Sequence, residues 1–115
     1  MPGLPAPIDI VFDGTPNGPT ATQLEAASCT VRCWDSLIRD AVEGLAALLA
    51  EAELPIPDDV WEAFDVIGIT VPADSYDPSG AVHVLIDLAH VDHPDDFLPA
   101  IDVVDGRVVE VLSGT

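Results

Sequence analysis

A long apolar stripe with helical spacing constrains the fold more than any other feature of this chain. Apolar or small residues recur at alternating intervals of four and three positions, at Ala27, Val31, Trp34, Ile38, Ala41, Leu45, Leu48 and Ala52. Residues at this spacing lie on one face of an α-helix, and here that face is widened by Leu37 and Leu49. The stripe predicts one long amphipathic helix whose apolar face packs on another element.

Signals at both ends of the stripe set the limits of that helix. Thr22 and Glu25 have the spacing of a capping box, in which two side chains bind free N–H groups at the start of a helix. Pro55 follows the last apolar position, and proline ends a helix because it lacks an N–H donor and clashes with the preceding turn. We therefore expect the helix to span residues 22–53, and a further short turn of helix to begin at Asp58.

Strand signals stand on either side of the helix. Alternation of apolar and polar side chains predicts a short strand before it, and runs of β-branched residues predict strands after it. The strands are expected at residues 8–12, 64–71, 81–91, 99–104 and 107–112. Within the third of them, Val84 and Ile86 should lie on one face of the sheet, and His83 and Asp87 on the other.

Asp105 and Gly106 separate the last two of these strands. An Asp-Gly pair favours a type I′ hairpin, because both central positions of that turn need positive φ. Short connections also favour antiparallel pairing, since parallel neighbours need a crossover of a dozen residues or more. The expected fold is α+β, with one long amphipathic helix packed on a mainly antiparallel sheet of four or five strands.

Length and composition predict one soluble domain. The chain of 115 residues fits a single domain over residues 1–115, and its 49% of hydrophobic residues exceeds what disordered chains carry. Residues 1–7 hold three prolines and a glycine and are expected to form an extended arm. We find no basic targeting signal and no apolar stretch of the ~18 residues that a membrane span needs. The expected location is the cytoplasm.

The charge of the chain is strongly unbalanced. It has 21 acidic residues against three arginines, Arg32, Arg39 and Arg107, and its formal net charge is -18 at pH 7. A field of this sign repels nucleic acid and anionic membranes and attracts basic surfaces. We therefore expect no direct binding to nucleic acid or to membranes. Adaptation to high internal salt is an alternative explanation, and an excess of Asp over Glu of 15 to 6 agrees with it.

The first functional hypothesis is a non-enzymatic binding protein that neutralises a basic protein target. An inhibitor or immunity-type partner of a nuclease would act in this way, and so would a mimic of nucleic-acid charge in a phage or defence system. Loop carboxylates pair with Arg or Lys, and aromatic rings beside them add burial and cation–π contact. The residues expected to contact the partner are Asp58, Asp59, Trp61, Asp74, Tyr76, Asp77, Asp92, Asp95, Asp96 and Phe97.

Two further hypotheses belong to other classes of protein. A small enzyme or ligand-binding domain would hold a pocket between the sheet and the helix, lined by residues such as His83, Asp87 and Tyr76. A structural subunit would assemble, for example as a homodimer through the long helix or a sheet edge, and its acidity would serve salt adaptation alone.

The sequence contains no motif that assigns a catalytic residue, cofactor or metal. His83, His90 and His93 are metal-ligand types, but His83 and His90 point to opposite faces of a strand, so at most two of the three converge. Cys29 and Cys33 are one helical turn apart, where a disulfide would be strained. We expect both to be reduced thiols that pack on the flank of the helix.

Overall fold

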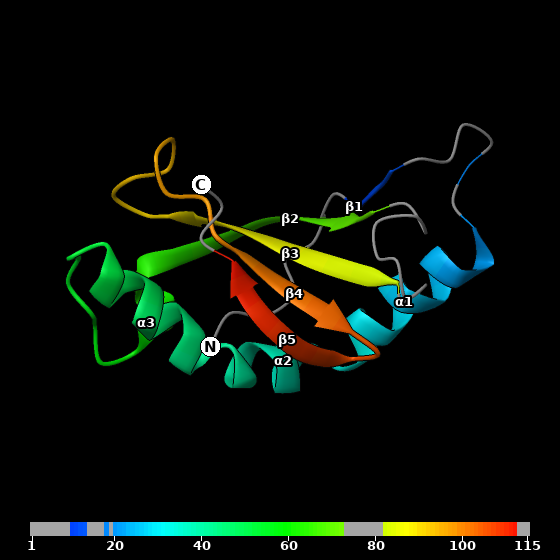
Figure 1. The fold of residues 1–115 in the computed structure, drawn as a ribbon, viewed down its shortest axis with the longest axis horizontal. Coiled ribbons are helices and arrows are strands. Elements are labelled where there is room, and N and C mark those ends of the chain that lie inside the picture. Colours follow the sequence, from blue (N-terminus) through cyan, green and yellow to red (C-terminus); the bar gives the residue numbers. More distant parts are fainter. Residues whose placement is uncertain (1–9, 14–17, 19, 73–81, 113–115) are drawn as a thin grey trace.

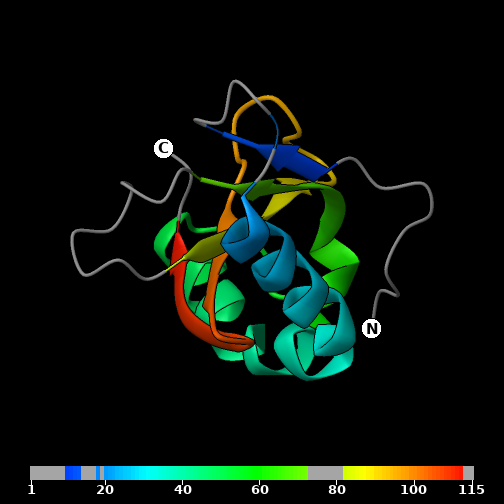
Figure 2. The ribbon, with the colours of Figure 1, turned by 90° about the vertical axis from the view of Figure 1, so that its right-hand side faces the viewer.

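The computed structural model describes residues 10–13, 18, 20–72 and 82–112. It is built from a five-stranded sheet with helices on one face (Figure 1, Figure 2). The elements in chain order are β1 (Ile10–Phe12), α1 (Ala21–Arg32), α2 (Trp34–Asp40), α3 (Val42–Glu51), the 3-10 helix η1 (Val60–Ala63), β2 (Phe64–Val71), β3 (His83–His90), β4 (Ala100–Val104) and β5 (Arg107–Leu112). The fold class is α+β, as predicted. The predicted arm at residues 1–7 lies outside the described residues.

The strands stand in the sheet in the order of the sequence. β2, β3, β4 and β5 form the predicted antiparallel meander. β1, however, is parallel to β2, with Ile10 opposite Ile69 and Phe12 opposite Val71, so the sheet is mixed. The parallel pair is possible because the whole helical layer lies between β1 and β2 in the sequence and provides the long crossover that such a pair requires.

The hairpin between β4 and β5 is confirmed. Asp105 has a φ of 52° and Gly106 a φ of 73°, the two positive values that a type I′ turn needs. Val104 and Arg107 pair directly across this turn. The hairpin is therefore set by the local conformations that these two residues tolerate.

The predicted single helix is instead three short helices that meet at Cys33 and Ala41. The hydrogen-bond ladder continues through both joints, because Cys33 N–H donates to the Cys29 carbonyl at 3.0 Å and Ala41 N–H to the Leu37 carbonyl at 3.1 Å. The helical segment is thus bent and not interrupted. A straight helix of the predicted length would extend about 48 Å, whereas an eight-residue strand such as β3 extends only about 26 Å. Bending keeps the apolar stripe over the sheet.

The start of α1 also differs from the prediction. Thr20 is the N-cap residue and Gln23 its capping-box partner, in place of Thr22 and Glu25. Gln23 N–H donates to Thr20 Oγ1 at 3.1 Å, and Thr20 N–H donates to Gln23 Oε1 at 3.0 Å. Both pairs have the right spacing, and the burial of Gln23 decides between them.

The hydrophobic core fills the space between the helices and the sheet. Its largest fully buried apolar side chains are Leu37, Ile38, Leu45, Leu49, Ile69, Val71, Val84, Ile86, Leu88, Ile101 and Val103. Val31 departs from the predicted stripe, since it is 38% exposed while its neighbour Thr30 is buried. The buried residues of α1 are Gln23, Ala27 and Thr30, so two of the three are polar. Over the described residues, no helix is long and apolar enough to cross a bilayer.

Candidate functional site

Five of the acidic residues predicted to contact a partner lie together at one end of the molecule. The segment before β2 and the turn after β3 are neighbours, because these strands are antiparallel and Phe64 pairs with His90. Val91 N–H also donates to the Ala63 carbonyl at 3.0 Å. The five residues that these contacts bring together, all exposed, are Asp58, Asp59, Asp92, Asp95 and Asp96. Asp74, Tyr76 and Asp77 lie outside the described residues.

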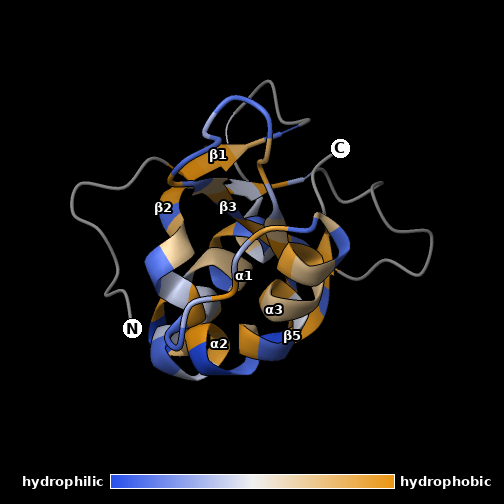
Figure 3. Ribbon diagram, turned by 90° about the vertical axis from the view of Figure 1, so that its left-hand side faces the viewer, coloured by the Kyte–Doolittle hydropathy of each residue, from blue (hydrophilic) through white to orange (hydrophobic). Residues whose placement is uncertain are grey.

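Glutamates from α3, the loop after it and η1 extend this cluster. We call the surface formed by the following exposed carboxylates the acidic end: Glu51, Glu53, Asp58, Asp59, Glu62, Asp92, Asp95 and Asp96. Figure 3 views the molecule from this end. The arginines are elsewhere, since Arg32 and Arg39 belong to α1 and α2 and Arg107 begins β5. Like charges crowded in this way repel one another unless salt or a cationic partner screens them.

Two hollows with apolar floors open within the acidic end. The larger, of about 470 Å³, lies between the end of α3 and the turn after β3 and is lined by Leu48, Glu51, Ala52, Leu54, His93, Asp96 and Phe97. The smaller, of about 270 Å³, is lined by Pro55, Ile56, Pro57, Glu62, Ala63, His90, Val91 and Asp92. Each hollow therefore combines an apolar surface with exposed carboxylates. A lysine or arginine side chain divides in the same way, into an apolar stem and a charged tip.

Of the aromatic residues predicted to contact a partner, Trp61 and Phe97 are described by the structure, and they differ in burial. Trp61 is only 5% exposed, and its indole N–H donates to the Ile38 carbonyl at 3.0 Å. It anchors η1 on α2 and lies in the core, away from the surface on which it was predicted, because its apolar ring gains more from burial than from exposure. Phe97 is half-buried, stacks on the His90 ring with centroids 5.8 Å apart, and lines the larger hollow.

The three histidines do not converge. His90 is buried and His93 exposed, with ring centroids 5.1 Å apart, and His90 Nδ1 accepts a hydrogen bond from Asp92 N–H at 3.1 Å. His83 lies at the other end of β3, where its Nδ1 is 2.7 Å from Asp102 Oδ1. Within the described part of the chain, no three His, Cys, Asp or Glu side chains are grouped closely enough to hold a metal ion.

His83 and Asp87, which the ligand-binding hypothesis placed in one pocket, do not line the same hollow. Asp87 lines a hollow of about 390 Å³ on the sheet face opposite the helices, where Thr70 Oγ1 donates to its carboxylate at 2.8 Å. Burial raises the pKa of the Asp87 carboxyl, and the hydrogen bond from Thr70 opposes that rise. His83 is not among the described residues that line this hollow.

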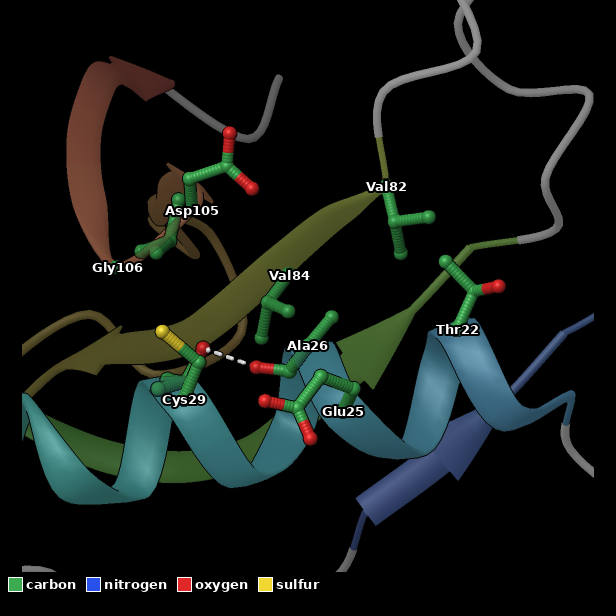
Figure 4. Close-up of a pocket in the computed structure, with 10 residues that line it drawn as sticks. Thr22, Glu25, Ala26, Cys29, Val82, Val84, Asp105 and Gly106 are labelled. Atoms are coloured by element: carbon green, nitrogen blue, oxygen red, sulfur yellow. Dashed lines mark hydrogen bonds between the residues drawn. The ribbon is translucent and has the colours of Figure 1, made fainter.

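A further hollow, of about 440 Å³, lies between α1 and the β4–β5 hairpin (Figure 4). Its polar lining includes Glu25, Cys29 and Asp105. Cys29 and Cys33 are free thiols, and both are half-buried, as expected. Sequence spacing placed the two cysteines on one side of a helix, but only the fold shows that the hairpin turn lies against them.

Comparison of the chain with models of protein families, with curated proteins and with solved structures finds no match. The candidate sites therefore rest on the geometry and charge of this chain alone.

Proposed function

We propose that this chain is a non-enzymatic binding protein whose acidic end receives a basic protein surface. The observation that carries the proposal is the gathering of eight exposed carboxylates around two hollows with apolar floors, at an end of the molecule to which no arginine belongs. Each hollow suits the stem of a lysine or arginine, and the carboxylates beside it suit the charged tip.

The physical roles of the two kinds of surface differ. The carboxylates steer a basic partner toward the acidic end and set its orientation, which speeds association at low salt. Affinity comes from a few side chains that are buried on binding. Ile56, which is 51% exposed, and Phe97 provide apolar surface for this purpose. An inhibitor of a nuclease, an immunity-type protein and a mimic of nucleic-acid charge would all use such a surface.

Affinity capture with matched variants tests the proposal. The first variant carries Asp58→Asn, Asp92→Asn, Asp95→Asn and Asp96→Asn in the acidic end. The control variant removes the same charge from exposed positions elsewhere, through Asp35→Asn, Asp40→Asn, Glu43→Gln and Glu110→Gln. Each bait is exposed to lysate of the source cell and washed at ~0.1 M and then at ~0.5 M NaCl, which straddle physiological screening.

We expect the wild type and the control variant to retain a basic protein at low salt. The acidic-end variant should not retain it, and the high-salt wash should remove it from every bait. Equal retention by both variants would show that net charge alone attracts the protein, and the proposal would then be wrong. If no bait retains a basic protein, the ligand-binding and assembly hypotheses replace it.

The captured protein then identifies the kind of target. If the chain mimics nucleic-acid charge, it must compete with DNA or RNA for the purified target, and the acidic-end variant must lose that competition. An inhibitor or immunity-type protein would instead block the activity of the target whether or not nucleic acid is displaced.

A further inference from the structure

The thiols of Cys29 and Cys33 meet at the turn of the β4–β5 hairpin. A Cβ atom added to Gly106 would stand 2.9 Å from Cys29 Sγ and 3.2 Å from Cys33 Sγ. Two sulfur atoms that are both this close to one point border the same small volume. The absence of a side chain at Gly106 leaves room for them there.

Regular structure holds both sulfurs and the turn in place. Cys29 is part of α1, and Cys33 N–H donates to the Cys29 carbonyl at 3.0 Å. Gly106 is held by the hairpin, in which Val104 and Arg107 pair directly. A site built on helices and strands keeps its ligands better placed than one built on loops.

The surroundings of the thiols favour a cation. Cys29 lines the hollow of about 440 Å³, and the carboxylates of Glu25 and Asp105 line the same hollow (Figure 4). The Arg32 guanidinium, which donates to Glu25 Oε1 at 3.1 Å, belongs to the residue directly before Cys33. A guanidinium in this position offsets part of the negative charge that two thiolates carry.

We propose that Cys29 and Cys33 form a two-coordinate site for a soft monovalent cation with a filled d shell, of which Cu(I) is the biological example. Thiolate is the ligand that such cations prefer. Binding replaces each S–H bond with a bond from sulfur to the metal and releases two protons, so no oxidant or reductant takes part. The described residues provide no group of three ligands, which disfavours the four-coordinate sites that Zn²⁺ forms.

Titration of the reduced full-length chain with Ag(I), a redox-inert cation of the same class, tests the site under anaerobic conditions. We expect one ion per chain to protect both thiols from a thiol reagent. Cys29→Ser and Cys33→Ser should each weaken binding roughly 10²-fold or more, because the second sulfur no longer acts as an intramolecular ligand. Competition between the chain and a Cu(I) chelator should rank the variants in the same order.

Two results would overturn the proposal. One is the binding of two ions per chain, and the other is equal affinity in the wild type and the single-cysteine variants. Each would show that the thiols act independently.

A pair of glycine variants keeps the test decisive if a serine variant fails to fold. Gly106→Ala puts a carbon atom against both sulfurs and should weaken binding. Gly18→Ala also imposes backbone strain, since Gly18 has a φ of 101°, but a Cβ there would meet nothing within 4 Å. Equal binding by the two variants would contradict the site. Because the dithiol shares no residue with the acidic end, the failure of either proposal leaves the other unaffected.

Discussion

The side-chain amide of Gln23 donates a hydrogen bond to the Pro72 carbonyl at 3.1 Å, and so ties the first turn of α1 to the end of β2. The same nitrogen lies 3.2 Å from the Asp13 carbonyl and 3.3 Å from the Val71 carbonyl. Gln23 is fully buried, and its side-chain oxygen accepts from Thr20 N–H. One polar side chain thus joins the helix cap to the ends of the paired strands β1 and β2.

Replacing this amide should destabilise the fold. Gln23→Leu keeps the size of the side chain but removes the donor to the buried Pro72 carbonyl and the acceptor of Thr20 N–H, at about 1–3 kcal/mol for a buried group. We expect the free energy of unfolding, measured with urea, to fall by at least about 2 kcal/mol. Ser28→Ala on the exposed face of the same helix is the control, with an expected change within about 0.5 kcal/mol. Equal stability of the two variants would mean that the Gln23 bonds contribute little.

Alanine at Gly106 should cost more stability than alanine at Gly18. Both glycines have positive φ, so both substitutions introduce backbone strain. Only at Gly106 does the new methyl group meet Cys29 Sγ, at 2.9 Å, and overpacking of this kind costs about 1–3 kcal/mol in addition. Thermal or urea unfolding of the two variants measures the difference. If the two variants are equally stable, the methyl group added at Gly106 does not overpack against the thiols.

The raised pKa of Asp87 predicts a pH-dependent effect of Asp87→Asn. Because burial disfavours the ionised carboxylate, the folded state binds its proton more tightly than the unfolded state. The ionised form therefore destabilises the fold, an effect that is absent below the ordinary pKa of 3.8, develops as pH rises toward the raised folded value and is complete above it. Asn removes this effect and can still accept the bond from Thr70.

We accordingly expect Asp87→Asn to be more stable than the wild type at pH 7, with a difference that shrinks as pH falls toward 4. Urea unfolding between pH 4 and pH 8 measures it. Asp65→Asn removes one negative charge from an exposed position and controls for net charge. A stability difference between Asp87→Asn and the wild type that does not vary with pH would contradict the assigned cause.

Salt should stabilise the chain. At a net charge of -18, repulsion between carboxylates opposes the compact state, and ions screen it. Between ~0.02 M and ~0.5 M NaCl we expect a gain of at least about 1 kcal/mol, or about 4 °C in Tm. The acidic-end variant defined above should gain less, because four of its repelling charges are absent. A salt response that is unchanged in that variant would place the repulsion elsewhere in the molecule.

Local patterns in the sequence determined the strands, the helical character of residues 21–51 and the hairpin at Asp105 and Gly106. These features depend on side-chain periodicity and on backbone conformations that a few neighbouring residues tolerate, so they can be read without the fold. The acidic surface follows from composition in the same way, and Asp58 and Asp92 were both identified as candidate contacts from their loops.

Only the tertiary structure decided how these parts are joined. The buried contacts of Gln23 make Thr20 the N-cap residue in place of Thr22. The helical segment bends at Cys33 and Ala41 and so follows the sheet, and β1 pairs with β2 in parallel. The tertiary structure also buries Trp61 and places Gly106 against Cys29. Each of these outcomes depends on contacts between residues distant in the sequence, whose free energies a local pattern does not contain.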